Sequence, residues 1–259
     1  MSVNFLEKIR SYVERRVELM PDNLIETPNT LDFCQIFTTP TKPIIISEVK
    51  FASPSRGQIY PGQLNHVDIA SSYINAGAAA VSVLAEPNYF KGSIDFIKDI
   101  RAAHPELHIL LKDFVLSKKQ IAQGLLCGAN AVLLIATFLN KDLLKELYDY
   151  SLHCGLTPII EVHNALELEQ ALQVSPRVIG INNRNLQTLE ISLDTSGNLI
   201  KHIPDDCYVI CESGIDNAVQ IQEMKDIGLD GFLIGSMLMR HENPGMELQK
   251  LISEVRNES

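Results

Sequence analysis

Eight short apolar runs recur along the chain after residue 43, with room for a helix between successive runs. They cover residues 43–50, 79–85, 108–113, 131–136, 157–163, 177–182, 207–213 and 231–236. The runs are continuous rather than alternating, a pattern typical of strands buried on both faces of a parallel sheet. We therefore expect eight buried parallel strands.

Helical patterns precede and separate these runs. The N-terminal one has an apolar stripe every four residues, formed by Phe5, Ile9, Val13 and Val17. Other patterns cover 117–130, 141–155, 164–172 and 216–228. Two of them open on a capping box, because Ser117 is followed by Gln120, and Asn164 by Glu167, three residues later.

The repeated strand–helix order predicts a (β/α)8 barrel, and a doubly wound sheet is the alternative. Polar or small residues stand at the carboxyl ends of the runs: Glu48, Lys50, Lys112, Glu161, Asn182, Arg184, Glu212, Ser213, Gly235 and Ser236. In a barrel these ends converge on one mouth, whereas in an open sheet several would lie too far apart to cooperate. We expect a single domain, with a helical extension over 1–42 packed on a barrel over 43–259.

Composition narrows the possible partners. The net charge is −10, so the overall field disfavours nucleic acid and anionic membranes, although a local cationic pocket could hold a small anionic substrate. No apolar run approaches the length of a membrane span. The five cysteines show no CxxC spacing, and the seven histidines form no zinc motif.

The first 20 residues, MSVNFLEKIRSYVERRVELM, contain no apolar core of a signal peptide. The glutamates among them argue against a mitochondrial presequence, which would be poor in acidic residues. The cysteine usage suits a reducing compartment. We therefore expect a cytoplasmic protein.

The first apolar run ends in the stretch EVKFASPSRG (48–57), where Glu48 and Lys50 are two residues apart. Residues at this spacing point to the same side of a strand. One such pair is usually a structural ion pair. Three cationic and three acidic side chains converging on one mouth are harder to explain structurally, because unpaired buried charges are costly.

Five stretches in this order resemble the indole-3-glycerol phosphate synthase family of tryptophan biosynthesis. They are EVKFASPSRG, LKDFVLS, IIEVHNALELEQAL, IGINNRNLQTLEISL and ESGI…GFLIGSMLMR. The resemblance covers nearly the whole chain. It implies conversion of 1-(2-carboxyphenylamino)-1-deoxyribulose 5-phosphate to indoleglycerol phosphate, carbon dioxide and water, without a metal or organic cofactor.

The resemblance also implies roles for individual residues. Lys112 matches the general acid, Glu161 the acid/base or electrostatic partner, and Lys50 the group that holds the substrate carboxylate, while Glu48 and Asn182 match supporting catalytic groups. The substrate and phosphate contacts match Ser53, Arg184, Glu212, Ser213, Gly214, Gly235 and Ser236. The apolar wall around the aromatic ring matches Phe90, Phe114, and Leu133 or Leu134.

The chain departs from the family pattern at three places. Leu111 stands where arginine is frequent, Phe51 where a basic residue is frequent, and Cys211 where a small residue is usual. Leu111 and Cys211 have the opposite strand parity to Lys112 and Glu212, so we expect them to face the helices. Phe51 would make the mouth less basic.

A phosphate site is expected where strands 1, 7 and 8 meet. Ser53 would join the backbone amides of 213–214 and 235–236, and the short helical stretch MLMR would add a helix N-terminus. SPSRG is also a plausible simple turn, and it is not a P-loop because it lacks GxxxxGK. His163 shares the parity of Glu161, but a histidine at a helix entry is more often structural, so it is left out of the site.

Two other functions remain open on the residues alone. One is an aldolase that forms a Schiff base through Lys112 or Lys50. The other is a barrel that binds a sugar phosphate without turnover, against which the full set of acid and base positions argues. The sequence leaves open the oligomeric state, the order of proton transfers and any contact with neighbouring enzymes of the pathway.

Overall fold

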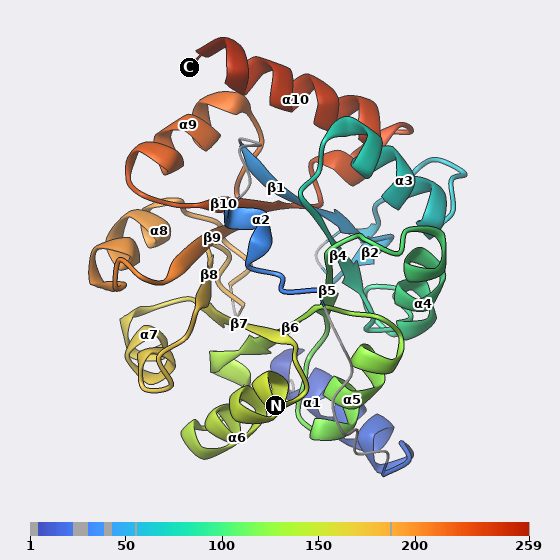
Figure 1. Ribbon diagram of the computed structural model, residues 1–259, viewed down its shortest axis with the longest axis vertical. Coiled ribbons are helices and arrows are strands. Elements are labelled where there is room, and N and C mark those ends of the chain that lie inside the picture. The colour runs from blue at the N-terminus through green and yellow to red at the C-terminus, as the bar shows by residue number, and fades with distance from the viewer. Residues whose placement is uncertain (1–4, 23–30, 39–42, 55, 187, 259) are drawn as a thin grey trace.

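Eight parallel strands close into a barrel in the computed structural model, which describes residues 5–22, 31–38, 43–54, 56–186 and 188–258 (Figure 1). They are β1 (Ile44–Val49), β4 (Ala80–Leu84), β5 (Ile109–Lys112), β6 (Ala131–Ile135), β7 (Thr157–Val162), β8 (Val178–Asn182), β9 (Tyr208–Glu212) and β10 (Gly231–Ile234). The order around the barrel is β1-β10-β9-β8-β7-β6-β5-β4, and β4 pairs with β1. Each predicted apolar run contains one strand, so the barrel prediction is confirmed.

Helices surround the strands (Figure 1). They are α3 (His66–Ala76), α4 (Ile94–Ala103), α5 (Lys118–Leu126), α6 (Lys141–His153), α7 (Ala165–Leu172), α8 (Asp194–Leu199), α9 (Ala218–Asp226) and α10 (Pro244–Glu258), with 3-10 turns η1 (Ala136–Phe138), η2 (Ile200–His202) and η3 (Leu238–Arg240). A hairpin of β2 (Ala52–Ser53) and β3 (Gly57–Gln58) follows β1. The predicted helices are confirmed, although α9 begins after Asn217 rather than on Asp216, because the Asn217 side chain caps it.

Alternating strand residues divide the core into two layers. Ile45 and Val49 pack outward against the helices, whereas Ile46 of the same strand packs inside the barrel. Leu111 and Cys211 belong to the outer layer, as their parity predicted. The charged residues of the inward set, Glu48, Lys112, Glu161 and Glu212, stand at or next to the carboxyl ends of their strands, which places them at one end of the barrel.

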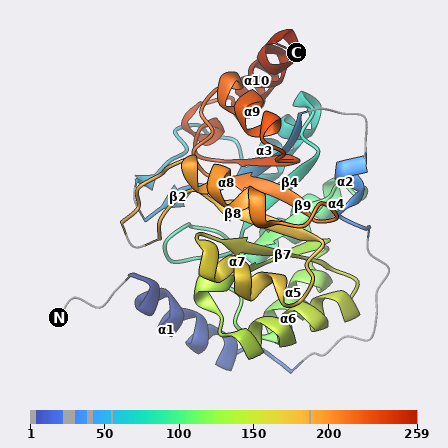
Figure 2. The same ribbon diagram turned by 90° about the vertical axis from the view of Figure 1, so that its left-hand side faces the viewer.

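Helices α1 (Phe5–Glu18) and α2 (Gln35–Thr38) of the N-terminal segment lie towards opposite ends of the barrel. Figure 2 shows α2 at one end, and α1 and β2 towards the other. Ile9 and Val13 of α1 are buried, as its stripe predicts, while the side chain of Phe5 is outside the described residues. The proposed boundary at residue 42 also lies outside them.

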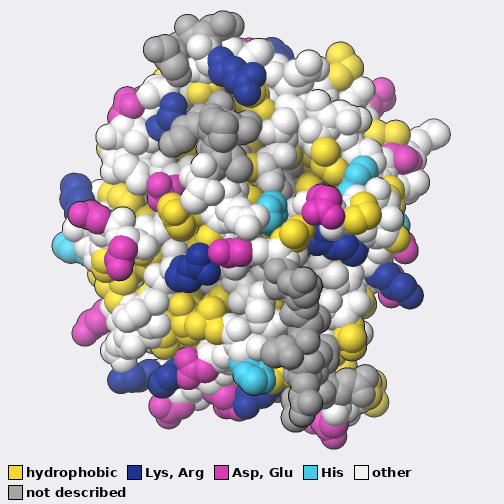
Figure 3. Space-filling model, viewed as in Figure 1, with side chains coloured by type: hydrophobic (Ala, Val, Ile, Leu, Met, Phe, Trp, Pro, Cys, Tyr) yellow, Lys and Arg dark blue, Asp and Glu magenta, His cyan; other side chains and the backbone are white. Residues whose placement is uncertain are grey.

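The described surface offers no extended patch of one charge on the face in Figure 3, where acidic and basic side chains are interspersed. Among the described residues, no helix is both long and apolar enough to cross a membrane.

Candidate active site

The carboxyl ends of the strands surround a pocket, and every predicted site residue except Leu134 lines it. Leu133 of β6 faces the pocket, whereas Leu134 is fully buried in the outer layer. Consecutive residues of a strand point to opposite faces, so only one of the two leucines could serve the wall. Leu134 is therefore removed from the predicted site.

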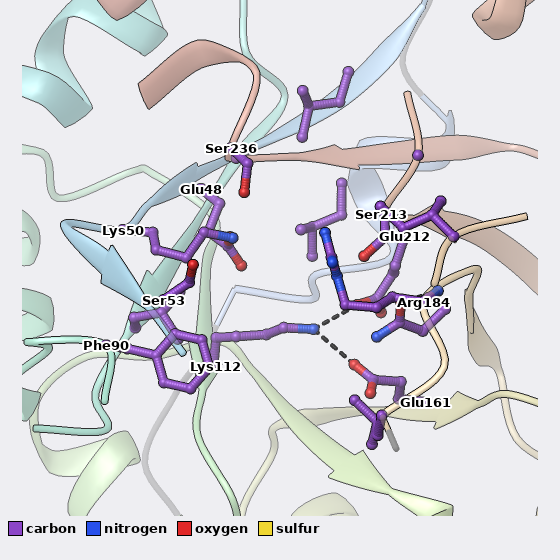
Figure 4. Close-up of a pocket in the computed structure, with 18 of the residues that line it drawn as sticks. Glu48, Lys50, Ser53, Phe90, Lys112, Glu161, Arg184, Glu212, Ser213 and Ser236 are labelled. Carbon is purple, nitrogen blue, oxygen red and sulfur yellow. Dashed lines mark hydrogen bonds and ion pairs between the residues drawn. The ribbon is translucent and has the colours of Figure 1, made fainter. Parts of the chain in front are cut away.

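Lys112 lies between two buried carboxylates at the centre of the pocket (Figure 4). Its Nζ is 2.9 Å from Glu161 Oε2 and also forms an ion pair with Glu212 Oε2. The side chain of Lys112 is 14% exposed, and those of Glu161 and Glu212 are 3% and 2% exposed. The three come from β5, β7 and β9, so the closed barrel is what brings them together.

The ammonium form of Lys112 is strongly favoured. Burial lowers the pKa of Lys112, but the carboxylates of Glu161, Glu212 and Glu48 outweigh burial and raise the pKa above its ordinary value. In the structure the acidic neighbours prevail, so Lys112 carries its proton at neutral pH.

The two carboxylates respond differently to the same lysine. Burial raises the pKa of Glu161, but Lys112 and then His163 more than offset burial and hold this pKa well below its usual range. Burial raises the pKa of Glu212 to about 7; Lys112 opposes this rise, whereas Glu161 adds to it. Glu161 has two cationic neighbours and Glu212 has one, which accounts for the difference.

Glu48 and Lys50 form an ion pair at the end of β1, as their spacing predicted (Figure 4). Gly235 lies against this pair, since a Cβ placed on it would clash with the carboxylate of Glu48. A side chain at 235 would therefore displace Glu48. A substitution of Gly235 would thus disturb the ion pair as well as the phosphate contact expected there.

An apolar wall faces the charged cluster. Phe90 and Phe114 have ring centroids 6.2 Å apart, and Leu133 stands beside them in the pocket. The loop that carries Phe90 is wound around Glu86, whose buried carboxylate accepts backbone N–H bonds from residues 88–90. Phe51 lies outside the pocket and packs against Tyr60 and Phe96, so the expectation that it reduces the basicity of the mouth is wrong.

Small polar groups from three turns also line the pocket. Ser53, Ser213, Gly214 and Ser236 all contribute to it. Ser213 has a left-handed φ of 62°, a conformation that is uncommon outside glycine and clusters at functional sites. The helix expected after Ser236 is only the 3-10 turn η3, so its dipole contribution is small.

Arg184 is fixed by its own loop. Its backbone N–H donates to Asn182 Oδ1 at 3.0 Å, and its Nη1 donates to the carbonyl of Leu189 at 3.1 Å. Burial lowers the pKa of Arg184, and repulsion from Arg56 adds to this effect. Two cationic side chains therefore stand near the small polar groups.

Sequence reasoning missed part of the site. Arg56, Leu186, Leu189 and Ile191 line the pocket from loops, where no periodicity marks the residues that point inward. His163 contacts Glu161 with Nε2 3.3 Å from Oε1, and the shared strand parity was the signal that could have included it. Asn164 caps α7 as predicted, since its Oδ1 accepts from the backbone N–H of Glu167, but the reciprocal bond of the box differs, because Glu167 accepts the backbone N–H of His163 rather than that of Asn164.

Solved structures share this architecture at low sequence identity. The chain is similar to 3-hexulose-6-phosphate synthase from Salmonella typhimurium, with a TM-score of 0.67 and 10% identity over 83% of this chain and all of that one. It is also similar to KGPDC from Streptococcus mutans, with a TM-score of 0.62 and 12% identity over 83% and 98% of the two chains. These likenesses support the fold alone.

Sequence relatives are more specific. The family model described as indole-3-glycerol phosphate synthase matches residues 5–251. A protein of that name from Aquifex aeolicus is 38% identical over 96% of this chain and 99% of its own. One from Sulfurimonas denitrificans is 41% identical over 85% of this chain and 83% of its own. The chain therefore belongs to the indole-3-glycerol phosphate synthase family.

Proposed function

We propose that this chain converts 1-(2-carboxyphenylamino)-1-deoxyribulose 5-phosphate to indole-3-glycerol phosphate, carbon dioxide and water. One observation carries the proposal beyond family membership: a buried ammonium lies between two carboxylates in a pocket that Phe90 and Phe114 also line. This combination suits a reaction that moves protons at a sugar ketone while an aromatic ring is held still.

Ring closure comes first. The ring carbon that bears the carboxylate attacks the ketone carbon, and the carbonyl oxygen needs a proton as the new bond forms. Lys112 is the proposed general acid. Its high pKa makes it a weak acid towards the neutral ketone, but its charge stabilises the oxygen as that oxygen becomes negative, and the proton then transfers.

Loss of carbon dioxide restores the aromatic ring. The carbon–carboxylate bond breaks, and its electron pair returns to the ring. Lys50 is the proposed holder of the carboxylate, with Glu48 keeping the ammonium directed into the pocket. An ion pair of this kind orients the group without trapping it, since the carbon dioxide that leaves carries no charge.

Dehydration completes the indole. The hydroxyl formed from the ketone leaves as water after it receives a proton, and a ring proton is removed by a base. Glu161 is the proposed acid/base group, and its place beside Lys112 allows the charge of one to follow the proton of the other. Asn182 supports the site by accepting the backbone N–H that fixes Arg184.

The phosphate is proposed to bind where Ser53, Ser213, Gly214 and Ser236 meet. Their hydroxyls and backbone amides suit an anion, and Arg184 and Arg56 supply positive charge nearby. Glu212, which pairs with Lys112, completes the proposed substrate contacts. The aromatic ring lies against Phe90, Phe114 and Leu133 in this arrangement.

An assay with the carboxyphenylamino substrate tests the proposal. Indole fluorescence should appear with turnover, and the chain contains no tryptophan to obscure it. A Glu161→Gln variant should bind substrate nearly as well as the native enzyme and turn it over far more slowly. No indole product from the native enzyme would refute the activity, and binding lost in step with turnover would make Glu161 structural.

The aldolase alternative requires a neutral lysine. A Schiff-base lysine is activated when its pKa is lowered, whereas the acidic neighbours of Lys112 raise its pKa. Borohydride reduction in the presence of a keto-sugar phosphate should therefore leave no adduct on Lys112 or Lys50.

We also infer a cytoplasmic location, supported by five free thiols that suit a reducing compartment.

A further inference from the structure

His163 lies between two carboxylates at the carboxyl end of β7. Its Nε2 is 3.3 Å from Glu161 Oε1, and its Nδ1 is 2.9 Å from Glu167 Oε2. Lys112 contacts Oε2, the other oxygen of Glu161. Glu161 therefore has a basic group at each of its two oxygens, and one of these groups is held in turn by a second carboxylate.

The start of α7 resembles the starts of α5 and α9, which makes a comparison within the chain possible. In each, the residue before the N-cap donates its backbone N–H to the side chain four residues later, at 2.8 Å. The pairs are Leu116 to Gln120, His163 to Glu167 and Asp216 to Gln220. Glutamine satisfies this bond in α5 and α9, so the bond does not require a carboxylate.

What the carboxylate of Glu167 adds is the contact with the imidazole of His163. Oε2 of Glu167 accepts the backbone N–H and also lies 2.9 Å from Nδ1. Asn164 fixes the other oxygen, because its Nδ2 donates to Oε1 at 2.7 Å. Glu167 is thus held at the helix start in a position that directs the far side of the imidazole to Glu161.

The surroundings of His163 favour the imidazolium. Burial lowers the pKa of His163, but its contacts with the carboxylates of Glu161 and Glu167 raise it to about 10. The uncharged Thr137 is the other neighbour of Nδ1, at 3.3 Å. Nε2 is buried, and no hydrogen bond of ordinary geometry reaches it within the described part of the chain, so the ion pair with Glu161 offsets its burial.

We propose that His163, held by Glu167, is a positioning residue that fixes the Glu161 carboxylate beside Lys112. The inference rests on the acid/base role proposed above for Glu161. The charged groups that face Glu161 are Lys112 from β5, Glu212 from β9 and His163 itself. His163 balances the repulsion from Glu212 and leaves Lys112 free to act on the substrate.

Removing the imidazole should make Glu161 easier to protonate. The titration of Glu161 can be followed by carbon-13 NMR in protein labelled at the glutamate carboxyl carbons, with Glu161→Gln identifying its signal. We expect His163→Gln to move the Glu161 midpoint to higher pH by about one unit or more, since a neighbouring opposite charge shifts a carboxyl pKa by roughly 1–3 units. The kcat should fall more than KM rises.

Glu167→Gln provides a second variant that keeps the helix start intact, because glutamine already serves this position in α5 and α9. It should shift the Glu161 midpoint in the same direction by less. The double variant His163→Gln/Glu167→Gln should show no shift beyond that of His163→Gln, because Glu167 acts through His163. Gln220→Ala, which removes the matching bond in α9, should leave the midpoint unchanged.

The NMR readout does not depend on turnover. The positioning role of His163 and the acid/base role of Glu161 can therefore be refuted separately. An unchanged Glu161 midpoint in His163→Gln would overturn the positioning role, as would additive shifts in the double variant. A shifted midpoint with undiminished kcat would retain the contact with Glu161 but refute the catalytic role proposed for this glutamate.

Discussion

The two ends of the barrel bury different kinds of side chain. The end at which the strands begin, the floor, buries mainly apolar groups, whereas the end at which they finish, the mouth, buries charged ones. At the floor, Phe37 of α2 stacks on Tyr208 with ring centroids 4.4 Å apart, and Phe33 meets His108 edge-on at 5.9 Å. At the mouth, buried carboxylates surround Lys112. The ion pair at the floor, between Arg177 and Asp32, is largely exposed, so the buried contacts there are mainly apolar.

The charges at the mouth need a different reason. A buried ion pair is often no more stabilising than apolar residues of the same volume, although breaking one side of it is costly. The difference between the two ends therefore separates substitutions into two kinds. Changes at the mouth should act mainly on turnover, and changes at the floor mainly on the free energy of unfolding.

The largest effect is expected for Lys112→Ala, which removes the proposed acid. Loss of a general acid lowers the rate by about 10²–10⁴-fold, and loss of the charge adds to this. Steady-state kinetics measures the fall in kcat. The control is Lys145→Ala, because Lys145 forms an exposed ion pair with Asp149 at 2.6 Å and should keep native activity.

At the floor, Phe37→Ala should cost about 3 kcal/mol of unfolding free energy, the lower end for a buried phenylalanine. Phe37 is 8% exposed, packs on Tyr208 and is not among the residues that line the pocket. Urea denaturation measures the loss, and kcat should stay near the native value. A large fall in kcat at unchanged stability would contradict the claim that changes at the floor act mainly on the free energy of unfolding.

Ser53→Ala should raise KM with little change in kcat. The substitution removes one proposed hydrogen bond to a charged phosphate, worth about 1.5–3 kcal/mol. Inorganic phosphate should compete with substrate in the native enzyme and compete less well in the variant. Equal competition in the native enzyme and the variant would show that Ser53 does not contact the phosphate.

Glu212 should give native stability a pH dependence, because burial raises the pKa of its carboxyl despite the opposing charge of Lys112. The folded-state pKa of Glu212 is raised to about 7 from an ordinary 4.5, so the folded protein binds the extra proton between these values. Native stability should therefore fall, relative to Glu212→Gln, as pH rises from about 4.5 to about 7. Denaturation at pH 5 and at pH 8 measures the difference, and an opposite sign would contradict the assigned shift.

Much of the mouth could be predicted because it follows from strand parity. Lys112, Glu161 and Glu212 end continuous apolar runs, and a barrel brings such ends together. Parity could not choose between Leu133 and Leu134, since it requires a known reference residue on the same strand. The structure provides that reference by placing Leu133 in the pocket.

Other features depend on tertiary positions that no local pattern encodes. Leu186 and Ile191 reach the pocket from a loop, and their direction is set by how that loop folds back. His163 was set aside because helix-entry histidines are usually structural. Its role emerges only when Glu167, at the start of α7, is seen to hold the imidazole against Glu161.

The most direct test of the charged mouth is the release of carbon dioxide from substrate labelled in its carboxylate, during a single turnover with excess Lys112→Ala. Ring closure must precede decarboxylation in this account, and ring closure needs the Lys112 ammonium. We predict that bound substrate keeps its label on the time scale in which the native enzyme releases it. Release by the variant at the native rate would contradict the central claim.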